Sequence, residues 1–302
     1  MGFPCLGAAR RFEPGRHLPF VIDNRQVGWV RRDDLHWLAG FEHVIGVDAD
    51  RVELSPSLDT VAARSDALRD VIGALAANGR ITGWRDETYG VRNRFDDPPL
   101  AFIERAASRF FGTQTFAAHL NGIVQAPDAD EPKMWIARRS LSKAADPGML
   151  DNLVGGGIGW GYSVEETLYK ECWEESGIPE PLARQAVHGG TLYVLQEIEE
   201  GTQAEQLFIF DLDVGVDFEP RNQDGEVADH RLAAIDEVLG WIGEGLMTVD
   251  ASLAALDWMS REGARRTHGA TAGQSRVGEP PAGAWLDVAT REALQALTQP
   301  TS

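Results

Sequence analysis

The sequence predicts a protein of the α+β class, in which a small N-terminal α+β domain precedes a larger domain. Hydrophobic residues make up 43% and charged residues 25% of the 302 residues, which is typical of a globular protein. Strand-like and helical segments are mixed along the chain, and their texture changes near Thr115. This length provides ample core for one large domain or for two.

The first third, residues 1–112, is expected to form the small N-terminal domain, and it carries no catalytic signature of its own. Its elements are predicted from apolar periodicity and turn residues. In chain order they are a β-hairpin over 20–31 that turns at Asp23-Asn24, short strands within 42–54, and helices over 59–78 and 98–111.

Residues 113–262 are expected to form the larger domain. Its predicted strands cover 116–124, 134–137, 191–197 and 206–213, and its predicted helices cover 164–176, 232–243 and 249–262. The remaining residues, 263–302, are rich in Gly, Ala, Thr and Pro as far as residue 283, which predicts a linker. A short helix over 288–297 is expected to dock back from this tail.

The charge balance limits the classes of partner. With 28 Lys+Arg against 47 Asp+Glu, the formal net charge is −19, which argues against binding nucleic acid polymers but not small phosphorylated ligands. No apolar run approaches the roughly 18 residues that span a bilayer, so no membrane partner is expected. The two distant cysteines and the absence of an apolar signal segment favour a cytoplasmic location.

Residues 155–178, GGGIGWGYSVEETLYKECWEESGI, carry the clearest chemical signal. Ser163 is followed three residues later by Glu166, a capping-box pattern that predicts a helix start, and Gly177 predicts the helix end. The preceding glycines let the backbone approach a ligand closely. They do not form a nucleotide P-loop, because Tyr162 stands where that motif needs lysine.

Three carboxylates of this helix are spaced to share one face. Glu171, Glu174 and Glu175 stand at positions i, i+3 and i+4. Clustered like charges make sense if a hard divalent cation neutralises them, and oxygen ligands favour Mg²⁺ or Mn²⁺. The alternative is a solvated acidic helix face, which is common in a chain with 47 acidic residues.

The segment resembles a Nudix box, in which glycines and a set of glutamates occupy fixed positions. The positions in register are Gly156, Glu171, Cys172, Glu174, Glu175, Gly177 and Ile178. Two positions depart from the pattern, because Tyr162 replaces the first glutamate and Lys170 replaces the arginine. Lysine keeps the positive charge there but loses the bidentate guanidinium.

The chain is also similar to the Nudix subfamily related to the C-terminal part of certain thiamine pyrophosphokinases. The segments that carry this similarity are HLNGIV (119–124), WIARRS (135–140), PGMLDNLVGGG (147–157), KECWEESGI (170–178) and NQDGEV (222–227). The first third resembles the domain that precedes the Nudix domain there, through LSPSLDT (54–60), GWRDETY (83–89) and IERAASRFFG (103–112). The similarity covers about residues 20–243.

The resemblance implies a Nudix α/β/α sandwich with a mixed sheet, and a hydrolase that cleaves a diphosphate linkage by water attack at phosphorus. It implies a Mg²⁺ or Mn²⁺ cofactor held by Glu174 and Glu175, with Glu171 as a third ligand or a base and a backbone carbonyl near Gly156. Glu226, beyond the box, is the candidate general base. The alternative for Glu226 is an ordinary turn acid, because Asp-Gly is a strong turn signal.

Four further residues are candidates for substrate binding. Arg138 and Arg139 end a predicted strand, and arginine suits bidentate phosphate recognition. Only one of two consecutive strand residues is expected to face the site, and surface charge is the alternative for both. Lys143 is a candidate of the same kind, and Trp160 in the glycine loop can stack on a heteroaromatic ring.

By this resemblance the expected substrate is a small thiamine-diphosphate-like molecule, including oxidised forms, cut to the monophosphate and phosphate. The box handles only the diphosphate, so ADP-ribose, a dinucleotide or a nucleoside triphosphate are alternatives. A sensor that binds a diphosphate without turnover is another, kept open by Tyr162 and Lys170. The N-terminal domain could shape the substrate pocket or mediate a homodimer, and no pyrophosphokinase activity is expected of it.

Overall fold

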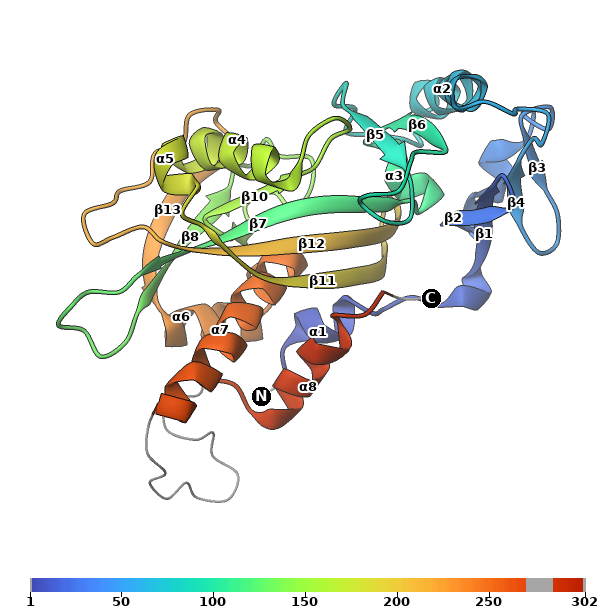
Figure 1. Ribbon diagram of the computed structural model, residues 1–302. Helices are drawn as coiled ribbons and strands as arrows, with labels where there is room; N and C mark the ends of the chain where they lie inside the picture. Colours follow the sequence, from blue (N-terminus) through green and yellow to red (C-terminus); the bar gives the residue numbers. More distant parts are fainter. Residues whose placement is uncertain (1, 270–284, 301–302) are drawn as a thin grey trace.

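The computed structural model describes residues 2–269 and 285–300, and it confirms the predicted α+β class (Figure 1). Two bodies lie side by side, a small N-terminal domain and a larger layered domain built around one sheet. Three apolar cores follow this division, one in the N-terminal domain and one on each face of the large sheet. Each face of that sheet is therefore covered by its own packed layer.

The N-terminal domain combines a four-stranded sheet, a two-stranded sheet and helices. Its strands are β1 (His17–Ile22), β2 (Arg25–Arg31), β3 (Ile45–Val47), β4 (Val52–Leu54), β5 (Thr88–Val91) and β6 (Ala101–Glu104). Its helices are α2 (Val61–Ala77) and α3 (Ala107–Phe111), with 3₁₀ turns at Pro14–Arg16 and Arg32–Leu38. The four-stranded sheet has the order β2-β1-β4-β3. The predicted hairpin is confirmed, because Asp23 and Asn24 take φ 53° and 58°, as a tight two-residue turn requires.

The helix expected over 98–111 is wrong in its first half. Residues Ala101–Glu104 form strand β6, which pairs antiparallel with β5, and only Ala107–Phe111 is helical. Alternate residues of β6 are buried, which is the period of a strand. A short apolar segment fits both periods, so pairing with β5 decides the outcome.

The large sheet is mixed and has seven strands. They are β7 (Gln114–Val124), β8 (Lys133–Arg139), β9 (Leu150–Asp151), β10 (Val154–Gly157), β11 (Val187–Ile198), β12 (Gly201–Asp213) and β13 (Val227–Ala234). The main order is β11-β12-β7-β8-β13, while β10 pairs with β7 and β9 with β8. Among the described strands of this sheet, β12 and β7 form the one parallel pair, so the predicted mixed sheet is confirmed.

Helices cover both faces of this sheet and make the predicted α/β/α sandwich (Figure 1). On one face lie α4 (Val164–Ser176) and α5 (Glu180–Ala183). On the other lie α1 (Pro4–Ala8), α6 (Ile235–Gly243), α7 (Val249–Gly269) and α8 (Val288–Ala296). The first residues of the chain thus join the core under α7, where Ala9 accepts a hydrogen bond from the amide of Leu195 on β11.

Two expectations for the last third need correction. The helix expected over 232–243 begins only at Ile235, because residues Val227–Ala234 pair with β8 as strand β13. Helix α7 continues past residue 262 to Gly269, so the first part of the expected linker is helical. The rest of that linker, 270–283, lies outside the described residues. The expected short C-terminal helix is confirmed as α8 and packs against α7.

The two domains are joined tightly at the turn between β11 and β12. Arg31 donates to the carbonyl of Ile198 at 3.0 Å, and Arg80 donates to that of Glu200 at 3.0 Å. Asp34 bridges both arginines, at 2.7 Å and 2.6 Å. Two arginines of the N-terminal domain thereby fix a hairpin of the larger domain.

Backbone also meets backbone at this joint. A Cβ on Gly201, at the start of β12, would collide with the carbonyl oxygen of Arg109 in α3 of the N-terminal domain. A Cβ on Gly112, directly after α3, would collide with the carbonyl oxygen of Trp29 and lie 3.1 Å from Cβ of Thr202 on β12. Gly112 also has φ +56°, where side chains are strained. Only glycine fits at these two positions.

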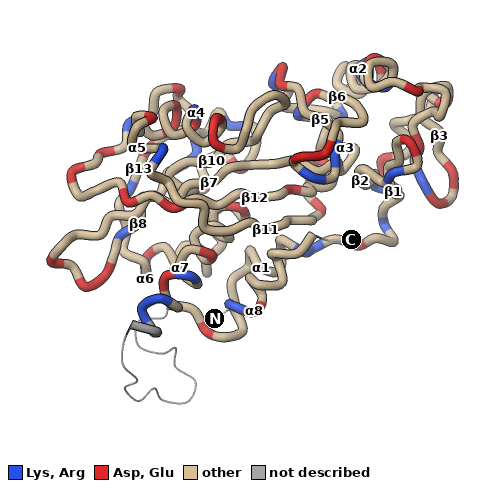
Figure 2. Tube along the Cα trace, viewed as in Figure 1, with Lys and Arg blue, Asp and Glu red and all other residues tan. Residues whose placement is uncertain are grey.

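Acidic side chains are spread over both domains, and α4 is one of several acidic segments (Figure 2). The net charge of −19 is therefore not a property of one face. Among residues 2–269 and 285–300, no helix is long and apolar enough to cross a membrane.

Candidate active site

Helix α4 is positioned by the local signals that predicted it. The hydroxyl of Ser163 accepts from the amide of Glu166, and the Glu166 carboxylate accepts from the amide of Ser163. Gly177 ends the helix with φ 66°. Leu168 and Cys172 lie on the buried side of the helix. The neighbouring glutamates are therefore held in a fixed position relative to β10.

Glu175 is the most enclosed of the three glutamates and is 4% exposed. The amide of Gly155 on β10 donates to its Oε2 at 2.8 Å, and Nζ of Lys143 donates to its Oε1 at 2.9 Å. Burial raises the pKa of Glu175 to about 7, although the ammonium of Lys143 opposes the shift. The carboxylates of Glu171 and Asp151 raise this pKa further, because like charges disfavour ionisation.

Glu171 and Glu174 share a second lysine. Nζ of Lys170 donates to Glu171 at 3.1 Å and to Glu174 at 2.8 Å. The Glu171 carboxyl group lies against Gly156, where a Cβ would come within 2.5 Å of its Cδ. Burial raises the pKa of Glu171, against the effect of Lys170. Gly156 thus leaves the room that the carboxyl group fills.

Glu226, from the turn before β13, joins the same cluster. Its Oε2 lies 2.6 Å from Nζ of Lys143, and its Oε1 lies 3.4 Å from Arg85 of the N-terminal domain. Burial alone would raise the pKa of Glu226, but the hydrogen bond from Lys143 and the nearby charges lower it. Lys143 is therefore a bridge between Glu175 and Glu226.

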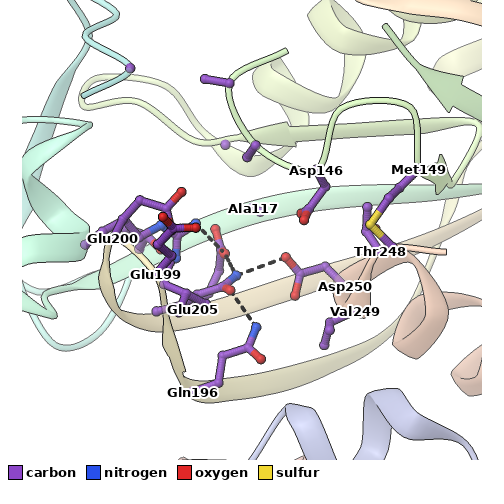
Figure 3. A pocket seen from close by; sticks show the side chains of 18 of the residues that line it. Ala117, Asp146, Met149, Gln196, Glu199, Glu200, Glu205, Thr248, Val249 and Asp250 are labelled. Carbon is purple, nitrogen blue, oxygen red and sulfur yellow. Dashed lines mark hydrogen bonds and ion pairs between the residues drawn. The ribbon is translucent and has the colours of Figure 1, made fainter. Parts of the chain in front are cut away.

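A cavity of about 1080 Å³ lies beside β10, between the large sheet and the N-terminal domain. Gly155, Gly156 and Gly157 form part of its wall. The N-terminal domain supplies Tyr89, Arg105 and Arg109, and α7 supplies Asp250, as the close view in Figure 3 shows for Asp250. The N-terminal domain thus forms part of the wall of this cavity.

The four predicted substrate-binding residues are dispersed. Arg139 lines the cavity and pairs with Asp151 at 2.6 Å, whereas Arg138 pairs with Asp229 outside it. Of the two, Arg139 therefore faces this cavity and Arg138 does not. Trp160 packs against Phe102 of the N-terminal domain and is not among the lining residues, and Lys143 contacts carboxylates instead.

Six residues that line the cavity were not predicted from the sequence. They are Tyr89, Arg105, Arg109, Gln203, Glu205 and Asp250. One signal was available, because Gln203 and Glu205 stand two apart just before the apolar run LFIF of the same strand and therefore share one face. A second signal was available for the N-terminal domain, because Arg105 and Arg109 stand in the segment IERAASRFFG (103–112), which carries the resemblance of the first third.

The residues near α4 fit a hard divalent cation in chemistry. They offer carboxylate oxygens beside backbone carbonyls of a glycine strand, the ligand types that Mg²⁺ takes. Within the described residues, however, no three His, Cys, Asp or Glu side chains are gathered closely enough to hold a metal. The glutamates are paired with Lys143 and Lys170 instead. Metal binding would therefore require these ammonium groups to move away from the carboxylates.

Comparison with known proteins assigns both domains. Residues 4–115 match a domain of unknown function, DUF4743, and residues 118–264 match the NUDIX domain. Nudix hydrolase 24, chloroplastic, of Arabidopsis thaliana is 37% identical over 253 residues, which cover 82% of this chain and 68% of the relative. The chain belongs to the Nudix hydrolases. It is accordingly a Nudix pyrophosphohydrolase, and enzymes of this family generally use divalent metal ions and act on small diphosphates.

Other relatives of this Nudix hydrolase are similar over the same extent. Nudix hydrolase 20, chloroplastic, of Arabidopsis thaliana is 35% identical, with 82% of this chain and 69% of the relative covered. Among solved structures, DR0079 from Deinococcus radiodurans is 20% identical with a TM-score of 0.41, covering 57% of this chain and 98% of that one.

Proposed function

We propose that this Nudix hydrolase cleaves a small diphosphate with the help of Mg²⁺ or Mn²⁺ held by Glu171, Glu174 and Glu175. A backbone carbonyl near Gly156 would complete the ligand set. The observation that carries the proposal is the position of Glu175. Its buried carboxylate sits between the Gly155 amide and the Lys143 ammonium, beside Glu171 and next to the cavity wall.

When bound, the metal would neutralise the diphosphate and acidify the attacking water. Glu226 is the proposed general base, since its lowered pKa keeps it ionised at neutral pH. It would take the proton as the water oxygen bonds to phosphorus and the bridging P–O bond breaks. Arg139, which lines the cavity, is proposed to hold a phosphate oxygen, because a guanidinium forms bidentate contacts with such groups.

The remaining three candidates take other parts in this proposal. Lys143 lies between Glu175 and Glu226 and would set their orientation and charge. Trp160 would hold the N-terminal domain against the glycine loop through Phe102. Arg138, exposed and paired with Asp229, would contact only a substrate that extends out of the cavity.

For the substrate we propose a thiamine-diphosphate-like molecule, including oxidised forms, cut to the monophosphate and phosphate. Support comes from the quoted segments that resemble the thiamine pyrophosphokinase-related subfamily, and from a cavity large enough for a ring system as well as a diphosphate. The subfamily, a cytoplasmic location and a homodimer stay predictions. The two Arabidopsis relatives are named chloroplastic.

A phosphate-release screen with Mg²⁺ tests the proposal. The panel contains thiamine diphosphate, its oxo and oxy analogues, ADP-ribose, a dinucleotide and a nucleoside triphosphate. Turnover of a thiamine compound supports the proposed substrate, and turnover only of ADP-ribose or a nucleotide replaces it. A folded protein that binds but releases no phosphate from any member would indicate a sensor.

Glu175→Gln tests the metal site. Loss of one buried ligand charge is expected to reduce kcat by at least about 100-fold. The matched control is Glu165→Gln, which removes the same charge from an exposed position in the first turn of α4. Equal activity of the two variants would show that Glu175 holds no metal.

A further inference from the structure

Four polar side chains meet on the floor of the cavity, away from the glutamates of α4. Gln196 comes from β11, Gln203 and Glu205 come from β12, and Asp250 comes from the first turn of α7. Figure 3 shows Gln196, Glu205 and Asp250 converging from these three elements. They face a space that also touches Gly155–Gly157.

The hydrogen bonds among them fix the orientation of Gln203. Its Oε1 accepts from Gln196 at 2.8 Å, and its Nε2 donates to Oδ2 of Asp250 at 3.0 Å and to Glu205. Both donors of the amide are therefore aimed at carboxylates. These hydrogen bonds prevent the amide group of Gln203 from rotating to present other atoms. The amide therefore holds the two carboxylates in fixed positions.

The two carboxylates differ in their partners. Glu205 is paired with Arg109 of the N-terminal domain at 3.3 Å. Oδ1 of Asp250 is buried and accepts no hydrogen bond from the described part of the chain. Burial and the neighbouring Glu205 charge raise the pKa of Asp250. Buried carboxylate oxygens are normally hydrogen-bonded, so this oxygen is set to accept from a molecule in the cavity.

The charge of Asp250 disfavours a diphosphate beside it. Arg109 pairs with Glu205 and Arg105 acts on Glu205 from farther away, whereas the carboxylate of Asp250 would repel a like-charged phosphate. The diphosphate therefore belongs at the end of the cavity formed by Gly155–Gly157, beside Glu175. Ala117, Met149 and Val249 line the same space (Figure 3), and such apolar groups suit the faces of a flat ring.

We propose that Asp250 and Glu205 form the subsite that recognises the non-phosphate end of the substrate, and that this end is a heterocycle whose edge donates N–H groups. The inference rests on the proposed function, since it assumes that a diphosphate occupies the other end. It makes Asp250 a specificity-determining residue. It also explains why the N-terminal domain contributes Arg109, whose pairing with Glu205 keeps that carboxylate ionised.

Asp250→Asn tests the subsite, because the side chain keeps its shape and loses its charge. The probes are thiamine diphosphate and CDP, which carry N–H donors, and geranyl diphosphate, which carries none. In the wild type we expect the first two to bind at least about 10-fold more tightly than geranyl diphosphate. In the variant their KM and Kd should rise roughly 10- to 100-fold, the range for a hydrogen bond to a charged group, with geranyl diphosphate unchanged within about 3-fold.

The matched control is Asp257→Asn, which removes a mostly buried carboxylate from the same helix where it pairs with Arg261, outside the cavity. It should leave all three affinities unchanged. If Asp250→Asn fails to fold, Asp250→Ser is the second variant, because it replaces the carboxylate with a smaller, neutral side chain. An equal loss for all three probes, or no loss for any, overturns the inference.

Measuring Kd by calorimetry without metal separates this inference from the proposed function. If the wild type hydrolyses no diphosphate, the proposed function fails, while the binding preference still tests Asp250. If the wild type hydrolyses diphosphates but binds the N–H-bearing probes no more tightly than geranyl diphosphate, the function stands and the subsite is wrong.

Discussion

Nζ of Lys143 lies 2.9 Å from Oε1 of Glu175, and both side chains are almost completely buried. The chain has only three lysines, and two of them contact glutamates of the box. The third, Lys133, is exposed at the start of β8. In this arrangement the lysines neutralise the carboxylates that are proposed to hold the metal.

Lys143→Met should therefore lower stability without metal and strengthen the response to it. Glu175 would lose its cation and take up a proton, which limits the loss to about 1–3 kcal/mol. Because the ammonium no longer competes, Mg²⁺ should raise the Tm more than it does in the wild type. Thermal melts with and without Mg²⁺ measure both effects. The control is Lys133→Met, and an equal Mg²⁺ response in all three proteins would contradict the prediction.

Gly156→Ala should displace the Glu171 carboxyl group. The new Cβ would lie 2.4 Å from Cγ and 2.5 Å from Cδ of Glu171, so that side chain must move. We expect the kcat/KM for phosphate release to fall at least about 10-fold, since a small misplacement of a reacting group is costly. Gly240→Ala is the control, because its Cβ meets nothing within 4 Å in helix α6. Normal activity of Gly156→Ala would remove Glu171 from the proposed site.

Glu226→Gln should reduce kcat by about 10²–10⁴-fold, the usual contribution of a general base. KM should change little, because Glu226 is proposed to contact water and not the substrate. The lowered pKa of Glu226 places the contribution of this group to the acidic limb of the wild-type rate profile below the ordinary glutamate value of about 4.3. Measured kcat across pH checks both points. Glu219→Gln, on the exposed loop before it, is the comparison, and matching rates would assign the base elsewhere.

Asp34→Asn should weaken the joint between the domains in a pH-dependent way. Burial alone would raise the pKa of Asp34, but hydrogen bonds from Arg80 and Arg31 lower it overall. A depressed pKa contributes stability that is present above the unfolded value of about 3.9 and is lost as pH falls through the folded value. We expect a deficit of about 2–3 kcal/mol at pH 7 that shrinks below pH ~4.

Urea unfolding at several pH values measures this deficit. Asp33→Asn is the control, because that neighbouring side chain is 84% exposed and its contact with Arg16 is 3.6 Å long. A deficit for Asp34→Asn that stays constant down to pH ~3 would show that the carboxylate charge is not what stabilises the joint.

The parts of the fold that were predictable depend on local signals. Ser163, Glu166 and Gly177 act within one helix, so the start and end of α4 could be read from sequence. The hairpin at Asp23-Asn24 is local in the same sense. Residues 98–111 were mispredicted because β6 exists only through its pairing with β5, which no property of the segment itself announces.

The candidate site likewise contains residues that local sequence signals predict and residues that only the packing of the fold brings together. The glutamates of α4 follow from their spacing on one helix, but their lysine partners do not, because Lys143 reaches Glu175 from a separate loop. The sequence does not predict that the residues of the cavity floor lie together. Arg109, Glu205 and Asp250 come from three elements of two domains, and only the packing of those elements brings them together.

The close approach of Gly201 to Arg109 limits how the two domains of this enzyme can be exchanged. Because backbone of one domain lies directly on backbone of the other there, a recombination point between the two domains would have to preserve the surface of each partner to within the size of a methyl group. Transplanting the catalytic half of a relative alone would leave the pocket without its second wall. The two domains should therefore be exchanged together. In chimeric enzymes the recombination points should lie outside both domains.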